Sequence, residues 1–232
     1  MTWQPNMREL EYGSLLSYTP RPESDDTDKL KQMRMSKDLM SYLKSDRIVL
    51  VQGRASANPT PMSGYVAQLL QERLTNVPFS DYFRKDVVLV PVPRSSLTRS
   101  EGLWVPERIA KAILLNNLTR NIEKCLIRTA PVRKSAWSPP SERPSPLAHY
   151  ESLAVQTRLQ ELKEVVLVDD VVTRGSTLLG AANRLLDAFP EARIRAFAAM
   201  RTISNPHDFE GWFQPVKGKI VWRWEGDTIR RP

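Results

Sequence analysis

The chain has 232 residues, 41% of them hydrophobic, enough for one sizeable α/β domain with additions or for two small domains at most. No apolar run approaches the roughly 20 residues that cross a bilayer, and the first residues do not form a basic stretch followed by an apolar one, so we expect a cytoplasmic protein. Cys125 is the single cysteine and the sequence has two histidines, so we expect neither disulfides nor a zinc site. The net charge of +8 favours anionic partners such as phosphorylated metabolites or nucleic acid, although a solvated basic surface would give the same charge.

The first third of the chain predicts two helices and one short strand. Residues 1–27 show no periodic pattern, and "SYTPRPESDDTD" is typical of a loop or a loosely attached extension. Apolar residues recur at helical spacing over 28–44 and 62–74, and "RIVLVQG" at 47–53 predicts a strand. We therefore treat residues 1–60 as an N-terminal extension or hood.

The middle of the chain predicts a buried strand, a helix and a second strand. "VVLVPVP" at 87–93 is β-rich and stops at prolines, Val105-Pro106-Glu107 is typical of a helix start, and "KCLIRT" at 124–129 is a further candidate strand. Five prolines then interrupt 130–146, which excludes a regular helix there. Irregular segments of this length are usually lids, binding loops or disordered.

The last third predicts a βαβ unit. The apolar strand "VVLV" at 165–168 is followed by a helix whose apolar face runs from Leu178 to Phe189, and then by the strand "RIRAFAAM" at 193–200. Such a unit implies a parallel sheet with right-handed crossovers. We predict an α/β, three-layer fold with a mostly parallel central sheet, a core at 61–202, and an aromatic, basic tail at 203–232 that adds an edge strand or cap.

The boundary between that strand and helix carries the most specific chemistry. Asp169 and Asp170 come at the carboxyl end of the strand, where open parallel sheets bind ligands. The turn that follows leads into a helix N-terminus, which attracts phosphate, and Gly175 allows the backbone close to an anion. Its hydroxyl donors are Thr173, Ser176 and Thr177. Carboxylates that bind sugar hydroxyls or a magnesium ion, next to one phosphate, predict a ribose 5-phosphate ligand.

A simpler interpretation of the same residues is structural. The two aspartates would then belong to a strand-end turn, and Ser176 or Thr177 would act only as a helix N-cap.

The stretch "VVLVDDVVTRGST" resembles the signature for phosphoribosyl diphosphate (PRPP) in type I phosphoribosyltransferases. The resemblance implies that Thr173, Arg174, Gly175, Ser176 and Thr177 bind the 5-phosphate. Arg174 departs from the family pattern, in which a small residue is frequent at this position. Its side chain would point outward or add a phosphate contact.

Two further stretches are similar to the ComF-like branch of that family. "VVLVPVPRSS" resembles its strand and diphosphate-binding loop, which implies that Arg94, Ser95 and Ser96 face the diphosphate. "LIRTAPVRKSAWSPPSERPSPLAHY" is similar in layout to a basic loop that closes over the site. Its cationic members would be Arg128, Arg133, Lys134 and Arg143. Solvent-exposed loops are the alternative for both stretches, and the N-terminal cysteine zinc module frequent in this branch is absent from the sequence.

The resemblance implies transfer of ribose 5-phosphate from PRPP to a nitrogenous acceptor, with release of diphosphate. Asp169 and Asp170 would hold the ribose hydroxyls and contact Mg²⁺ indirectly or through PRPP. The acceptor would bind residues outside the core, at 1–60 or 203–232, where Trp212, Trp222 and Trp224 could stack a base or simply pack the tail. The alternative is a PRPP-sensing, nucleic-acid-binding regulator or a DNA-uptake or defence-associated protein on the same fold. Either function leaves a homodimer open.

Overall fold

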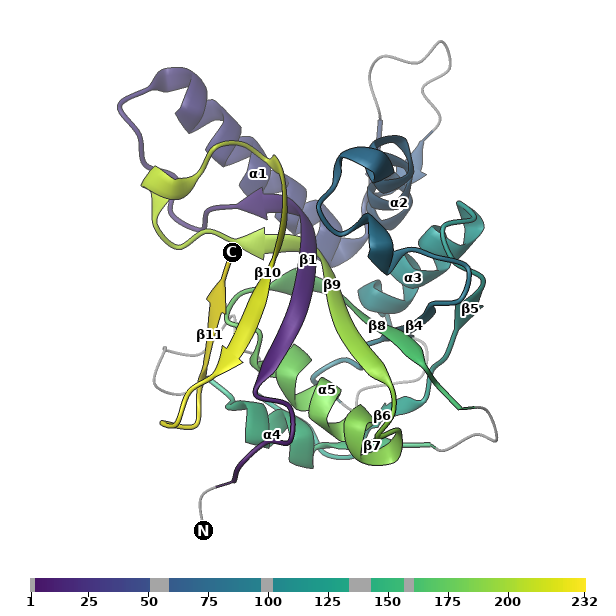
Figure 1. Ribbon diagram of the computed structural model, residues 1–232. Helices are drawn as coiled ribbons and strands as arrows, with labels where there is room; N and C mark the ends of the chain where they lie inside the picture. The colour runs from purple at the N-terminus through teal and green to yellow at the C-terminus, as the bar shows by residue number, and fades with distance from the viewer. Residues whose placement is uncertain (1–2, 51–58, 97–101, 134–142, 157–160) are drawn as a thin grey trace.

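A seven-stranded sheet forms the centre of the computed structural model, which describes residues 3–50, 59–96, 102–133, 143–156 and 161–232 (Figure 1). The strand order is β11-β10-β1-β9-β8-β4-β5. The neighbouring strands β1, β9, β8, β4 and β5 are parallel to one another. Strand β10 is antiparallel to both of its neighbours, β1 and β11. The strands are β1 (Glu9–Tyr18), β4 (Val88–Pro91), β5 (Asn121–Ile122), β8 (Glu164–Val172), β9 (Arg193–Thr202), β10 (Phe213–Trp222) and β11 (Thr228–Arg231).

Two small antiparallel sheets flank the central one within the described residues. They pair β2 (Ile48–Val49) with β3 (Thr60–Pro61), and β6 (Leu126–Arg128) with β7 (Leu153–Val155). The α-helices described are α1 (Thr27–Ser45), α2 (Met62–Arg73), α3 (Val105–Leu115), α4 (Pro146–Glu151) and α5 (Ser176–Ala188). None of the helices described is long and apolar enough to span a membrane.

Helices cover both faces of the sheet, as the sequence predicts (Figure 1). On one face, side chains of α1, α2 and α3 pack against Leu89, Val166 and Phe197 of the strands. On the other face, α5 packs against Leu167 and Ala196, and α4 packs on α5. The fold is therefore mixed α/β in three layers with a mostly parallel sheet, and the predicted edge strand of the tail is confirmed by β11.

The expectation of an irregular segment over residues 1–27 was wrong for β1, and it is confirmed for residues 19–26, which form neither helix nor strand. This strand lies inside the sheet between β9 and β10. Gly13, Ser14 and Ser17 interrupt its apolar pattern, which hid the strand in the sequence. Gly13 has a packing reason: a Cβ atom there would lie 2.6 Å from the ring of Phe79.

The contact at Gly13 predicts a loss of stability on substitution. Gly13→Ala places a methyl group against the buried Phe79 ring, and overpacking of a core costs about 1–3 kcal/mol. Urea denaturation measures the change in the free energy of unfolding. Gly211→Ala is the matched control, because a Cβ there meets only Gln32 Oε1 at 3.5 Å. Equal stability of the two variants would contradict the packing role of Gly13.

Candidate functional site

The candidate site lies at the carboxyl ends of β4 and β8. These strands are parallel, with Pro91 opposite Val168, and the pairing continues through the Val92 amide, which donates to the Val168 carbonyl at 2.9 Å. The segment after β4 therefore runs beside Asp169 and the residues that follow it. The structure thus brings together two stretches that are more than 70 residues apart in the sequence.

The two adjacent carboxylates are half-buried and already have partners. Lys44 of α1 donates to both carboxylate oxygens of Asp170, at 2.8 and 2.9 Å. Asp169 Oδ1 accepts the Asp170 amide at 2.9 Å, and Asp170 Oδ1 accepts the Val171 amide at 2.6 Å. Lys44 was not predicted as a site residue, since nothing in a helical lysine signals a contact with residues so distant in the chain.

The position of Lys44 follows from the way in which α1 ends. Asp46 adopts a left-handed conformation (φ 46°) just after the helix. Its carboxylate accepts the Ser63 amide at the start of α2, at 2.8 Å, and pairs with Arg108 of α3, at 2.9 Å. One buried carboxylate therefore joins three helices and holds Lys44 over the acidic pair.

Burial and mutual repulsion change the protonation of this cluster. Burial and then the neighbouring Asp170 charge raise the pKa of Asp169 to about 7, and Lys44 opposes that rise. Burial disfavours the Lys44 ammonium, but Asp170 and Asp169 outweigh it and raise the pKa of Lys44. The cluster therefore stays charged at Lys44, while Asp169 titrates near neutral pH.

The turn after β8 has the backbone that its sequence predicts. Gly175 has φ +92° and precedes the first residue of α5. A Cβ at Gly175 would lie 2.6 Å from the Ile220 side chain, so the position requires glycine for two reasons. Thr173 is exposed, whereas Gly175 and Ser176 are buried.

The hydroxyls of this turn bond to other parts of the protein. Thr173 pairs with Thr202 at 3.0 Å, Ser176 with Thr228 at 2.8 Å, and Thr177 with His149 Nε2 at 3.2 Å. The Arg174 guanidinium pairs with Asp227 in the β10–β11 connection. A phosphate at this helix N-terminus would therefore contact backbone amides first, and would compete with these partners for the side chains.

His149 is a second residue that the sequence did not single out for this site. It is buried on α4, and burial together with the charges of Arg128 and Arg174 lowers the pKa of His149 to about 3. The imidazole is therefore neutral at physiological pH, and it fixes the Thr177 hydroxyl rather than binding an anion by charge.

Arg128 of β6 binds the loop that follows β4. Its guanidinium donates to the carbonyls of Pro93 (3.3 Å) and Arg94 (3.0 Å), and to Ser152 Oγ at 2.5 Å. Burial lowers the pKa of Arg128 to about 10, and the Asp169 carboxylate partly opposes this shift. Arg128 therefore positions the loop that carries the predicted diphosphate ligands.

The structure describes all but one of the remaining predicted loop residues. The Ser95 carbonyl accepts the Val132 amide at 2.8 Å, and the Arg94 guanidinium lies against Gly102. Arg133 is exposed and Arg143 half-buried, whereas Lys134 lies outside the described residues. Ser96 is half-buried at the end of the described β4 loop.

The carboxylates of Asp169 and Asp170 fit Mg²⁺ only when a bound ligand supplies further oxygen atoms. No group of three His, Cys, Asp or Glu side chains that could hold a metal occurs in the described part of the chain. Two adjacent carboxylates suit Mg²⁺ when phosphate oxygens and water complete the octahedron. Asp169 and Asp170 would thus hold the ion together with a bound diphosphate, and not as an independent site.

Comparison with known proteins adds no family assignment, since neither a protein-family model nor a curated protein matches the sequence.

Asp169 gives a prediction for stability against pH. Its native pKa lies above the unfolded value of about 3.9, so the native state binds the extra proton and stability falls as pH rises from about 4 to about 7. Asp169→Asn removes this fall. About three pKa units correspond to at most about 4 kcal/mol, so we expect the variant to be about 2–4 kcal/mol more stable than the wild type at about pH 8 and equal to it at about pH 4, by urea denaturation. A constant difference across this range would contradict the assignment.

Lys44 gives the opposite prediction. Lys44→Gln removes the cation that opposes repulsion between the two carboxylates, and the half-exposed side chain limits the loss to about 1 kcal/mol at about pH 8. The loss shrinks towards about pH 5, where Asp169 is protonated in the native state. Lys31→Gln is the control, because Lys31 forms an ion pair with the exposed Asp28 on the surface of α1. Thermal unfolding at both pH values distinguishes the two lysines.

Proposed function

We propose that the protein binds PRPP and transfers its ribose 5-phosphate group to a nitrogenous acceptor, with release of diphosphate. The observation that supports this most strongly is the juxtaposition of the β4 loop, the acidic pair and the N-terminus of α5 at one edge of a parallel sheet. These are the three parts needed to hold a diphosphate, a sugar and a phosphate. The motif resemblance supplies the type of ligand.

The proposed roles follow from charge and reach. Asp169 and Asp170 would accept hydrogen bonds from the ribose hydroxyls, and the amides before α5 would hold the 5-phosphate. The segment Arg94–Ser96 would hold the diphosphate, with Arg128 fixing that segment from behind. Bound Mg²⁺ would neutralise the negative charge of the diphosphate.

Catalysis of this kind needs positioning more than a nucleophile. Departure of diphosphate leaves positive charge on the anomeric carbon, and fixed carboxylates beside the sugar stabilise that charge. Asp170 would have to exchange part of its bond with Lys44 for the ribose hydroxyls. Lys44 would then remain close enough to hold the carboxylate in place.

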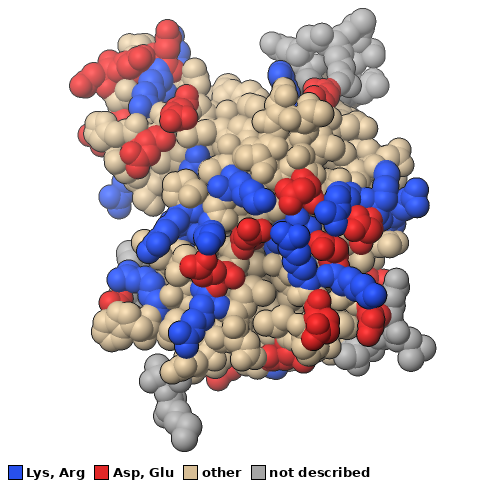
Figure 2. Space-filling view, in the orientation of Figure 1, with Lys and Arg blue, Asp and Glu red and all other residues tan. Residues whose placement is uncertain are grey.

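The surface supports a small anionic ligand more than a duplex nucleic acid on the face shown in Figure 2. On that face Lys and Arg side chains are mixed with Asp and Glu. Ion pairs between such charges among the described residues include Arg84–Asp86, Arg193–Glu11 and Lys217–Asp81. The nucleic-acid-binding alternative would be favoured by a continuous basic surface, which this face lacks.

Binding of PRPP with Mg²⁺ should raise the melting temperature. A ligand at about 100 times its Kd stabilises the native state by about 2.7 kcal/mol, which corresponds to several degrees for a chain of this size. Asp170→Asn should lose most of this shift, whereas Asp28→Asn, a change at an exposed carboxylate, should keep it. An equal shift in both variants would contradict the role of the acidic pair. Release of diphosphate with a panel of nitrogenous bases then separates an enzyme from a sensor.

A further inference from the structure

Strand β9 carries two buried arginines whose surroundings differ. Arg195 lies near the start of the strand and is 1% exposed, whereas Arg201 lies near its end and is 8% exposed. Moving a charged side chain out of water is costly unless the charge is paired and hydrogen-bonded. The partners of each guanidinium therefore indicate its role.

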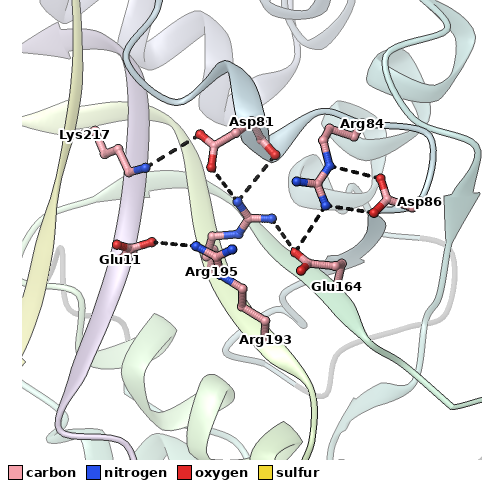
Figure 3. Close-up of polar contacts among 8 residues, drawn as sticks. All are labelled: Glu11, Asp81, Arg84, Asp86, Glu164, Arg193, Arg195 and Lys217. Atoms are coloured by element: carbon pink, nitrogen blue, oxygen red, sulfur yellow. Dashed lines mark hydrogen bonds and ion pairs between the residues drawn. The ribbon is translucent and has the colours of Figure 1, made fainter.

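Arg195 is paired inside the protein (Figure 3). Its terminal nitrogens donate to the carboxylates of Asp81, at 2.8 Å, and Glu164, at 2.7 Å. The guanidinium also lies 4.7 Å from the centroid of the Tyr82 ring. Arg195 is therefore a structural cation, and Arg84 and Lys217 extend the same network.

Arg201 has no comparable partners. Its side chain forms no hydrogen bond or ion pair with any residue in the described part of the chain, and its Nε atom is buried. Burial, and then the charge of Arg230, lower the pKa of Arg201; the Tyr12 hydroxyl and the exposed Glu210 oppose this only in part. The protein thus buries a cation beside another cation, without a carboxylate bound to it.

Another unused hydrogen-bonding group lies next to Arg201. Ser17 of β1 is its register partner in the parallel β1–β9 pair, so the two side chains share a face of the sheet. The Ser17 hydroxyl is fully buried and has no hydrogen-bond partner among the described residues. The neighbouring Arg230 donates to the carbonyls of Thr173 and Thr202, which fixes its position.

We propose that Arg201, Arg230 and Ser17 form an oxyanion site that takes a phosphate group. A guanidinium binds phosphate oxygens through parallel hydrogen bonds, and a bound dianion would balance both arginines. Arg230 donates to the carbonyl of the exposed Thr173, so the proposed site lies beside the turn before α5. The proposal does not depend on PRPP or on the acidic pair, because its residues lie on β9, β1 and β11.

The two buried arginines of β9 make a matched test. In phosphate-free buffer, Arg201→Met should be as stable as the wild type or more stable, since it removes a buried unpaired charge. Arg195→Met should be clearly less stable, because it removes the buried cation that bonds to both Asp81 and Glu164 at 2.7–2.8 Å and leaves them only the longer contacts to Lys217 and Arg84. A loss of stability in Arg201→Met equal to that in Arg195→Met would overturn the proposal, because it would make Arg201 structural.

Phosphate binding is then measured directly. Titration with inorganic phosphate, against chloride at equal ionic strength, should raise the melting temperature of the wild type and of Arg195→Met, but not that of Arg201→Met. Arg201→Lys, which keeps the charge but loses the paired donors, should bind phosphate at least several-fold more weakly and serves where the Met variant fails to fold. Equal phosphate shifts in the wild type and either Arg201 variant would overturn the site.

Comparison of ribose 5-phosphate with inorganic phosphate distinguishes a sugar phosphate from free phosphate as the ligand of this site. Ribose 5-phosphate that stabilises the wild type more than inorganic phosphate, with the gain lost in Asp170→Asn, would assign the site to a sugar phosphate. Equal effects of both ligands, unchanged in Asp170→Asn, would assign it to free phosphate. Both results keep the oxyanion site, and neither requires that PRPP binds, so failure of the proposed function would be seen separately.

Discussion

The candidate site depends on the parallel pairing of β4 with β8 and on its continuation past the end of β4. The hydrogen bond from the Val92 amide to the Val168 carbonyl keeps the two segments paired for one residue beyond the end of β4. The loop after β4 cannot then diverge before it passes Asp169, and Arg128 holds its next two carbonyls. Without this alignment the loop, the carboxylates and the helix N-terminus would be separate surface features. With it, they share one edge of the sheet.

Electrostatics at that edge are organised from outside the predicted core. Lys44 comes from α1, and the Asp46 carboxylate that follows this helix binds both α2 and α3. The anchor shared by three helices therefore keeps a cation next to the half-buried acidic pair. This arrangement balances the carboxylates in the absence of ligand, and it sets a cost for any ligand, which must replace part of the Lys44–Asp170 interaction.

The parts of the fold with local signals were predictable, and those that depend on distant contacts were not. The strand, turn and helix around Asp169 follow from an apolar run, Gly175 and helical periodicity, all within 25 residues. β1 was missed because Gly13 fits the ring of Phe79, a residue whose position no local pattern reveals. Lys44, His149 and Arg230 reach the site through tertiary packing alone, so their roles required the structure. Lys134 remains a prediction from the sequence.

The C-terminal hairpin accounts for an arginine at position 174. Its guanidinium pairs with Asp227, while Thr228 and Arg230 of the same hairpin bond to Ser176 and to the Thr173 carbonyl. A small residue at position 174 would leave the Asp227 carboxylate, whose Oδ1 is already buried without a partner among the described residues, with no cation. Arg174 is therefore accounted for as a contact to the hairpin. A phosphate bound at the N-terminus of α5 would compete with Asp227 for Arg174, and anion binding would then be thermodynamically coupled to docking of the hairpin.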